Sequence, residues 1–212
     1  METLPAIILA GGRSTRMGGG DKGLRDLAGR PMIAHVAARI AGQCAPVALS
    51  ANGDPARFAA LGLPVLADGM ADFPGPLAGI LAGMDWAAGI GAGAVISVAA
   101  DTPFLPRDLA SRLIAARGPG GLALAASRDA GGRVAEHPTF GLWPVALRAD
   151  LRAYLRSGGR RLSGFAEAHR PGIAIWQAGA LDPFFNVNDP GDLALARAIA
   201  AGGSQPAGAT DP

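Results

Sequence analysis

The sequence predicts an α/β protein of three layers, in which helices cover both faces of a mostly parallel sheet. Short apolar runs alternate along the chain with longer segments of helical periodicity. Half of the 212 residues are hydrophobic, so a sizeable core is available. We expect residues 1–200 to form a single domain, whose first half binds one ligand and whose second half binds another. Residues 201–212 are small, polar and proline-bearing, and we expect a disordered tail there.

Strands are expected where short apolar runs end at glycine or at a polar residue. The first run, Ala6–Ala10, leads into a glycine-rich loop, and the most strongly apolar run, Ala94–Ala100, ends at Asp101 and is stopped by Pro103. Further strands are expected at Pro46–Ala51, Leu63–Ala67, Gly121–Ala126, Thr139–Trp143 and Ile173–Trp176.

Helices are expected where apolar residues recur at spacings of three and four. The clearest case follows Pro31, which we place at the first helical position. Its apolar face comprises Met32, Ile33, Val36, Ala37 and Ile40. The other expected helices are Leu77–Ala88, Pro106–Arg117, Val145–Arg156, Arg161–His169 and Pro190–Ala201.

Charge and composition exclude several functional classes. The net charge is only +2 and aromatic residues make up 5%, so the basic stripe and stacking aromatics of a nucleic-acid binder are missing. A single cysteine, Cys44, excludes a disulfide framework and fits a reducing cytoplasm. The first apolar run is too short for a signal or a membrane span. We expect a cytoplasmic protein that binds neither nucleic acid nor membrane.

A lone lysine lies in the glycine-rich loop after the first strand. Lys22 is the single lysine among 19 lysine and arginine residues. Glycines let backbone N–H groups approach phosphate oxygens, and lysine acts on phosphate as a point charge. We therefore expect Lys22 to bind phosphate, with Arg13 and Arg16 supplying further charge. The position of the glycines fits neither the dinucleotide-binding pattern nor the P-loop pattern.

Polar residues stand at the carboxyl ends of the expected strands, where ligands of an open α/β sheet bind. Asp101 is expected to hold Mg²⁺, which takes one or two protein carboxylates and completes its shell with water and phosphates. A plain turn role before the next helix is the alternative. Asp68 is expected in the site as well, with Asp72 as its competitor. Gly79 would either allow a ribose or base to approach or let its helix pack against the sheet.

Three groups in the second half have competing interpretations. Asn186 and Asn188 would complete the ligand site or serve as turn formers, while Asp189 caps the last helix. Arg160 and Arg161 would hold a second anionic group or remain solvated. His137 shows no sequence neighbours that suggest nucleophilic or zinc chemistry.

The motifs together resemble a known family. The opening block, Leu9-Ala-Gly-Gly, Arg16-Met-Gly, Asp21-Lys22 and Leu27-Ala-Gly-Arg-Pro31, resembles the signature of nucleotidyltransferases that activate small phosphorylated molecules. The later motifs follow in the order seen in molybdenum cofactor guanylyltransferases: Asp68, Gly75-Pro-Leu-Ala-Gly79, Asp101-Thr-Pro, Glu136-His-Pro, Gly159-Arg-Arg and Asn186-Val-Asn188. The resemblance covers nearly the whole chain up to about residue 200 and implies a Rossmann-like nucleotidyltransferase fold.

This resemblance implies that GMP is transferred from GTP to the terminal phosphate of molybdopterin, with Mg²⁺, releasing pyrophosphate. By position, Leu9, Ala10, Gly11 and Gly12 would line the GTP, Lys22 its phosphates and Asp101 the metal, and Asp68 falls on a GTP-contacting position. Ser50 stands where the family commonly has asparagine, so contact there is open to Ser50, Asn52 or backbone alone. Proteins that insert the molybdenum cofactor or mature its recipient enzymes are the partners to expect.

Catalysis of this kind needs no general base, because a phosphate monoester is largely ionised at neutral pH. Lys22 and Asp101 would be the principal catalytic residues, with Arg16 in support. The alternatives are a molybdopterin cytidylyltransferase, a sugar-phosphate nucleotidyltransferase and, outside enzymes, a nucleotide-binding regulator.

Overall fold

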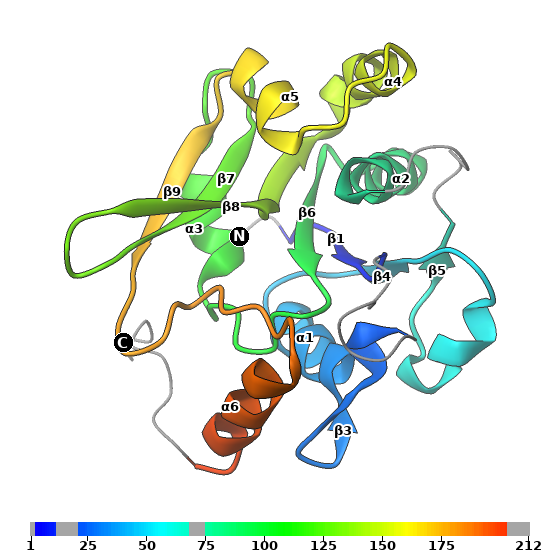
Figure 1. The fold of residues 1–212 in the computed structure, drawn as a ribbon. Helices are drawn as coiled ribbons and strands as arrows, with labels where there is room; N and C mark the ends of the chain where they lie inside the picture. Colours follow the sequence, from blue (N-terminus) through cyan, green and yellow to red (C-terminus); the bar gives the residue numbers. More distant parts are fainter. Residues whose placement is uncertain (1–2, 12–20, 68–74, 203–212) are drawn as a thin grey trace.

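A seven-stranded sheet forms the centre of the protein (Figure 1) within residues 3–11, 21–67 and 75–202, which the computed structural model describes. Its strand order is β5-β4-β1-β6-β8-β7-β9. The strands span Ala6–Leu9 (β1), Val47–Ser50 (β4), Val65–Leu66 (β5), Ala94–Ala99 (β6), Ala123–Arg128 (β7), Val134–Pro144 (β8) and Gly172–Gln177 (β9).

The sheet is mostly parallel, as predicted. β1 runs parallel to both β4 and β6, β5 runs parallel to β4, and β9 runs parallel to β7. β8 is antiparallel to its two neighbours, β6 and β7. Strands from the first and second halves of the chain therefore share one continuous hydrogen-bonded sheet, and the β6–β8 pairing joins them.

Helices cover both faces of this sheet, which confirms the three-layer prediction. On one face, α1 (Met32–Ala41) and α3 (Leu109–Ala115) pack with the sheet in one core cluster. On the other face, α2 (Pro76–Gly89), α4 (Arg148–Arg156) and α5 (Leu162–Ala168) pack with the sheet in a second cluster. The alternation of Ala6 and Ile8 with Ile7 along β1 divides that strand between the two clusters.

The last helix, α6 (Pro190–Ala200), lies apart from the sheet and packs on a third, smaller apolar cluster. Its Leu193 and Ala196 meet Leu27 and Met32 from the start of the chain. Residues 27–32 and α6, far apart in the sequence, thus pack together below the sheet, where Figure 1 shows α6 and β3.

Several short elements were not predicted from the sequence. A two-stranded hairpin, β2 (Asp26–Leu27) and β3 (Arg30–Pro31), turns through Ala28 and Gly29, both at positive φ. The described residues also form the 3₁₀ helices η2 (Lys22–Leu24), η3 (Pro55–Leu61) and η4 (Val145–Leu147). Pro31 is the residue before α1 rather than its first helical residue, because its extended backbone belongs to the hairpin.

Three expected boundaries were wrong by three residues or more. α3 begins at Leu109 rather than Pro106, and the Gln43 side chain bonds the Pro106 carbonyl at 2.9 Å and the Ala110 N–H at 3.0 Å. The expected helix from Val145 is a 3₁₀ turn until Arg148. β8 starts at Val134, well before the expected Thr139, because it forms an exposed hairpin with β7. Within the described ranges, none of the helices has the length and apolar character needed to cross a membrane.

Candidate active site

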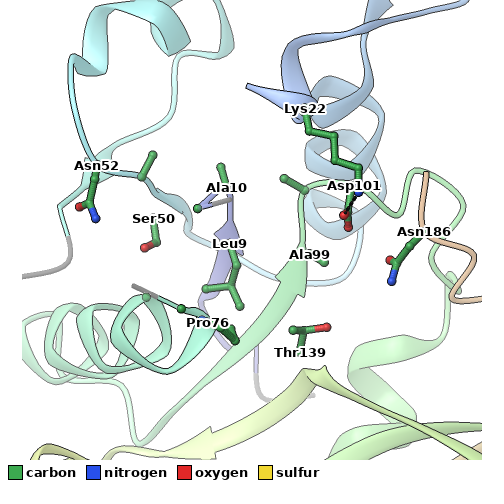
Figure 2. A pocket seen from close by; sticks show the side chains of 16 residues that line it. Leu9, Ala10, Lys22, Ser50, Asn52, Pro76, Ala99, Asp101, Thr139 and Asn186 are labelled. Carbon is green, nitrogen blue, oxygen red and sulfur yellow. Dashed lines mark hydrogen bonds and ion pairs between the residues drawn. The ribbon is translucent and has the colours of Figure 1, made fainter. Parts of the chain in front are cut away.

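A cavity of about 320 Å³ lies beyond the carboxyl ends of β1, β4 and β6 (Figure 2). This is where an open α/β sheet binds its ligands, because neighbouring strand ends diverge into loops there. The lining combines strand ends, the start of α2 and four residues from elsewhere. They are Leu9, Ala10, Gly11, Ser50, Ala51, Asn52, Ala99, Ala100 and Asp101; Gly75, Pro76 and Gly79; and Lys22 with Gly23, Thr139 and Asn186.

The Lys22 ammonium is held between two oxygen acceptors. Its Nζ lies 2.6 Å from Asp101 Oδ2 and 2.6 Å from Asn188 Oδ1. The Lys22 and Asp101 side chains are 18% and 25% exposed, so the pair faces the cavity while remaining largely shielded from water. Charge-assisted bonds of this length fix the lysine at the end of β6. The structure therefore brings together three of the residues singled out in the sequence.

The C-terminal segment is tied to the end of β6 by backbone and side-chain bonds. The Val187 N–H donates to the Asp101 carbonyl at 2.9 Å, and the Thr102 hydroxyl bonds the Asn186 side-chain oxygen. Asp189 and Asp192 form a reciprocal capping box at the start of α6, and Asp192 Oδ2 also accepts the Asn188 N–H at 2.7 Å. The helix cap and the cavity therefore share one network.

Gly79 faces the cavity and also lets α2 approach the sheet closely. A Cβ at this position would lie 2.7 Å from Ser50 Oγ and 2.9 Å from Leu9 Cδ2. Gly83, one turn later, stands equally close to Ile7. The packing interpretation of Gly79 is thus supported, and a side chain there would push α2 away from the strand ends that line the cavity.

Ser50 and Asn52 both line the cavity, so both remain candidates for contact with a nucleotide. Ser50 is 4% exposed beneath Gly79, whereas Asn52 stands on the rim. The Asn52 carbonyl accepts a bond from Arg57 Nη2. Arg57 Nε lies 2.5 Å from Asp21 Oδ2, next to Lys22. Arg57 thus links Asp21 to Asn52 beside the cavity. The sequence around Arg57 gave no indication of this role.

Thr139 reaches the cavity through an irregularity in β8. Leu124 of β7 pairs with Gly141, but the next residue, Ala125, pairs with His137, so residues 138–140 have no paired partner on β7. The Thr139 carbonyl instead accepts a 2.7 Å bond from the Ser97 hydroxyl, which accepts the Trp143 indole N–H at 2.7 Å. Sequence periodicity carries no signal for such a bulge, so Thr139 was missed as a lining residue.

Some predicted site residues stand elsewhere. Arg160 and Arg161 lie between α4 and α5, outside the residues that line the cavity. The Arg161 carbonyl accepts a 3.0 Å bond from the Tyr154 hydroxyl, and Arg160 Nη1 donates to the Gly159 carbonyl. Their acceptor-binding role remains a prediction. Gly12, Arg16 and Asp68, together with Arg13 and Asp72, fall outside the described residues.

Asp101 fits the requirements of a magnesium ligand better than those of a metal that needs an all-protein cage. Within the described ranges, no group of three or more His, Cys, Asp or Glu side chains could hold a metal. Mg²⁺ needs only one or two carboxylates when substrate phosphates and water supply the other oxygens. The Lys22 ammonium donates to Asp101 Oδ2, and the Thr102 hydroxyl lies 3.5 Å from Oδ1.

Comparison with known proteins gives a consistent set of relatives. The sequence pattern of the MobA-like NTP transferase domain matches residues 6–171. A molybdenum cofactor guanylyltransferase from Bradyrhizobium sp. is 53% identical over 203 residues, with 93% of each chain covered. One from Cereibacter sphaeroides is 52% identical, covering 91% of this chain and 95% of its own.

Solved structures with low sequence identity share the fold. Molybdopterin-guanine dinucleotide biosynthesis protein A from Archaeoglobus fulgidus superposes with a TM-score of 0.68 at 19% identity, over 93% of this chain and 99% of its own. The 2-C-methyl-D-erythritol 4-phosphate cytidylyltransferase of Thermus thermophilus gives 0.64 at 20% identity, over 95% and 100%. The Rossmann-like nucleotidyltransferase fold expected from the sequence is thereby confirmed.

Proposed function

The chain belongs to the molybdenum cofactor guanylyltransferases, within the MobA-like NTP transferase family, and we propose that it transfers GMP from GTP to the terminal phosphate of molybdopterin. The reaction forms a bond between an acceptor phosphate oxygen and the α-phosphorus of GTP. The bond from that phosphorus to pyrophosphate breaks, and pyrophosphate leaves with the electron pair.

The observation that carries the proposal is the position of Lys22 at the cavity end of β6. Its Nζ stands 2.6 Å from Asp101 Oδ2 and from Asn188 Oδ1, so a single cation is presented between a carboxylate and an amide. Negative charge grows on the oxygens of the α-phosphate and of departing pyrophosphate during transfer. A fixed cation in a partly shielded cavity stabilises such charge strongly, since little reorganisation is needed.

The nucleophile requires no base from the protein. The second pKa of a phosphate monoester is near 6, so its oxygens are already ionised at neutral pH. The side chains that line the cavity include neither a histidine nor a glutamate in the part of the chain that the structure describes. The task left to the protein is to hold two anionic substrates in line and to offset their charge.

Magnesium is part of the proposal, with Asp101 as the residue that would hold it. A bound Mg²⁺ would neutralise phosphate charge and orient the oxygens around the α-phosphorus. Lys22 would contact the phosphates, Leu9 to Gly11 the nucleotide, and Ser50 or Asn52 its ribose or base. Asn186 and Asn188 would complete the acceptor side.

The proposal places the reaction in the cytoplasm, in keeping with the single, buried, free thiol of Cys44. Its substrates would be GTP and molybdopterin. Proteins that insert the finished cofactor, or mature the enzymes that receive it, would be the partners downstream.

The first test is thermal stability with each nucleoside triphosphate, with and without Mg²⁺. A ligand that binds only the folded state adds about 2.7 kcal/mol at 100 times its Kd. We expect a shift with GTP that Mg²⁺ enlarges. A shift with CTP alone would instead indicate a cytidylyltransferase.

The second test is transfer itself, followed as pyrophosphate release from GTP in the presence of molybdopterin. Release that needs both substrates supports the proposal. Release with a sugar phosphate in place of molybdopterin would assign a sugar-phosphate nucleotidyltransferase. GTP binding without any release would leave a nucleotide-binding regulator.

A further inference from the structure

The segment that joins β9 to α6, residues 178–189, runs from the second half of the sheet to the last helix (Figure 1). We call it the connecting segment, and its Asn186 lines the cavity. At its cavity end, Asn188 contacts Lys22, Asn186 contacts Thr102, and the Val187 N–H bonds the Asp101 carbonyl. A displacement of the connecting segment would therefore move the groups that hold the Lys22 ammonium and the end of β6.

The far end of the connecting segment is fixed by Asp182. One carboxylate oxygen, Oδ2, accepts the Ser127 hydroxyl at 2.6 Å, and the other, Oδ1, accepts the Phe184 N–H at 2.7 Å. The Asp182 carbonyl also accepts the Phe185 N–H at 2.9 Å. These bonds close a turn a few residues before Asn186, and they tie the Asp182 carboxylate to Ser127 on β7.

His137 on β8 supports both the polar and the apolar side of this anchor. Its Nε2 lies 2.7 Å from Ser127 Oγ and 3.6 Å from Asp182 Oδ2. Its ring stacks on Phe184, with centroids 4.5 Å apart and planes 25° from parallel. Phe184 is itself 2% exposed, and it packs against Phe140 and Trp176.

The direction of the hydrogen bonds rules out a nucleophilic serine. The Ser127 hydroxyl has one proton, and it is given to Asp182, so Ser127 accepts from His137 Nε2–H. In a nucleophilic triad the serine would give its proton to histidine, which is the reverse order. Ser127 is also only 2% exposed, beyond the reach of a substrate. The hydrogen bonds from His137 to Ser127 and from Ser127 to Asp182 therefore serve to fix the position of the Asp182 side chain.

We infer that Ser127, His137 and Asp182 are positioning residues for nucleotidyl transfer, which act by holding the connecting segment so that Asn186 and Asn188 stay against Thr102 and Lys22. The inference rests on the proposed function for its catalytic consequence. The capping box of α6 fixes the other side of the asparagines, so removal of the anchor frees the connecting segment from one side only. The fold should survive while the geometry around Lys22 is lost.

Asp182→Ala tests the anchor directly, and Asp129→Ala is its matched control. Asp129 also accepts a backbone N–H, from Arg133 at 2.9 Å, but at the turn between β7 and β8. We expect Asp182→Ala to lower kcat/KM by at least about tenfold, since small misplacement of reacting groups is costly. Asp129→Ala should keep the wild-type value. Equal activity in the two variants would overturn the inference.

Two substitutions of His137 separate its hydrogen bond from its ring. His137→Gln keeps an amide donor near the position of Nε2, and His137→Phe keeps the aromatic stack. If the hydrogen-bond chain positions Asp182, the glutamine variant should retain more activity than the phenylalanine variant. The opposite order would remove His137 from the chain and leave it as a packing residue.

A double-mutant cycle distinguishes positioning from general weakening. The loss caused by Asp182→Ala should largely disappear in an Asn188→Ala background, because the anchor acts through the asparagines. If the losses of kcat/KM in the two single variants instead multiply in the double variant, Asp182 merely supports the fold.

Amide hydrogen exchange provides a readout that needs no activity. Val187 N–H should exchange at least about tenfold faster in Asp182→Ala, while core amides of β6 keep their wild-type rates. If the Val187 N–H exchanges slowly in wild type and faster in Asp182→Ala, but wild type transfers no GMP, the proposed function fails and the anchor stands. If GMP transfer occurs and Val187 exchange is unchanged by Asp182→Ala, the anchor fails and the function stands.

Discussion

Lys22 and Asp101 are 79 residues apart in sequence, and their ion pair is formed where the loop after β1 meets the end of β6. The two strands are neighbours in the sheet, so the parallel topology brings their carboxyl ends to one edge. Asn188 adds a second acceptor from the far end of the chain. A solvated surface lysine would not be held by two partners at this distance.

Lys22→Ala should damage catalysis far more than folding. Loss of one preorganised charge that stabilises a transition state costs about 10²–10³ in rate. A partly exposed ion pair contributes little to the fold, so the melting temperature should move by roughly 4 °C or less. Arg152→Ala is the control, because it breaks the 2.6 Å ion pair with Asp85 on the outside of the molecule. Comparable losses of activity in the two variants would argue against a catalytic Lys22.

His137 should make stability sensitive to acid. Burial lowers the pKa of this histidine below its usual 6.5, and the nearby Asp182 carboxylate only partly opposes the change. The unfolded chain therefore takes up the proton more readily than the folded protein does. The contribution of His137 to the free energy of unfolding is full above pH 6.5 and is lost as the pH falls toward its lower folded pKa.

Denaturant unfolding of wild type and His137→Gln checks this sign at about pH 7.5 and about pH 5.5. Other groups titrate in both proteins, so the difference between the two isolates His137. The advantage of wild type over the variant should shrink at the lower pH. An advantage that grows on acidification would mean that the folded pKa of His137 is raised, contrary to the burial argument.

At the scale of elements, the sequence was most informative where periodicity was clean. The apolar runs at Ala6 and Ala94 predicted the two central strands, and the spacing of Ile33, Val36 and Ile40 predicted α1. The rule that ligands bind beyond strand ends then located the cavity without any long-range information. Local pattern and overall topology agree in these elements, which is why they could be predicted.

Other features depend on contacts that no local pattern encodes. Thr139 reaches the cavity because β8 loses its pairing with β7 over residues 138–140. The side chain of Arg57, on the 3₁₀ helix η3, links Asp21 to the Asn52 carbonyl. The partners of His137 lie 10 and 45 positions away in sequence, on β7 and on the connecting segment, so its neighbours along the chain gave no sign of them.

Gly79→Ala tests the close approach of α2 to the sheet. The added methyl would meet Ser50 Oγ at 2.7 Å and Leu9 Cδ2 at 2.9 Å, both at the cavity wall. Overpacking of this kind costs about 1–3 kcal/mol, and we also expect a higher KM for GTP because the strand ends must shift. Gly89→Ala, at the end of the same helix, meets nothing within 4 Å and should be neutral or stabilising by up to about 1 kcal/mol. Equal stabilities measured by chemical denaturation would contradict the packing argument.

At the scale of the whole molecule, the β6–β8 pairing makes the two halves of the chain parts of one sheet. Core clusters on both faces include residues from before and after Asp101. A large hinge motion between the halves would break this pairing. We therefore expect substrates to enter without a large opening between the two halves.

Cys44 offers a chemical test of this cooperative core. The thiol is 2% exposed, and burial raises its pKa to about 12. A thiol reagent should therefore label the native protein at least about 1,000-fold more slowly than the unfolded chain, since labelling must await opening of the fold. Mass spectrometry of the labelled fraction over time measures the ratio. Fast labelling under native conditions would place Cys44 in a region that opens locally.

The bond from the Val187 N–H to the Asp101 carbonyl has a consequence for the order of biosynthesis. A ribosome releases the chain from its N-terminus, so β1, β4 and β6 emerge long before the connecting segment. Until then the nascent chain contains Lys22 and Asp101 but lacks Asn186 and Asn188. The edge of β7 that pairs with β9 is also still unpaired. The lysine site is thus completed only after the connecting segment has emerged, and a ribosome that stalls near Pro171 would leave an intermediate with an open sheet edge.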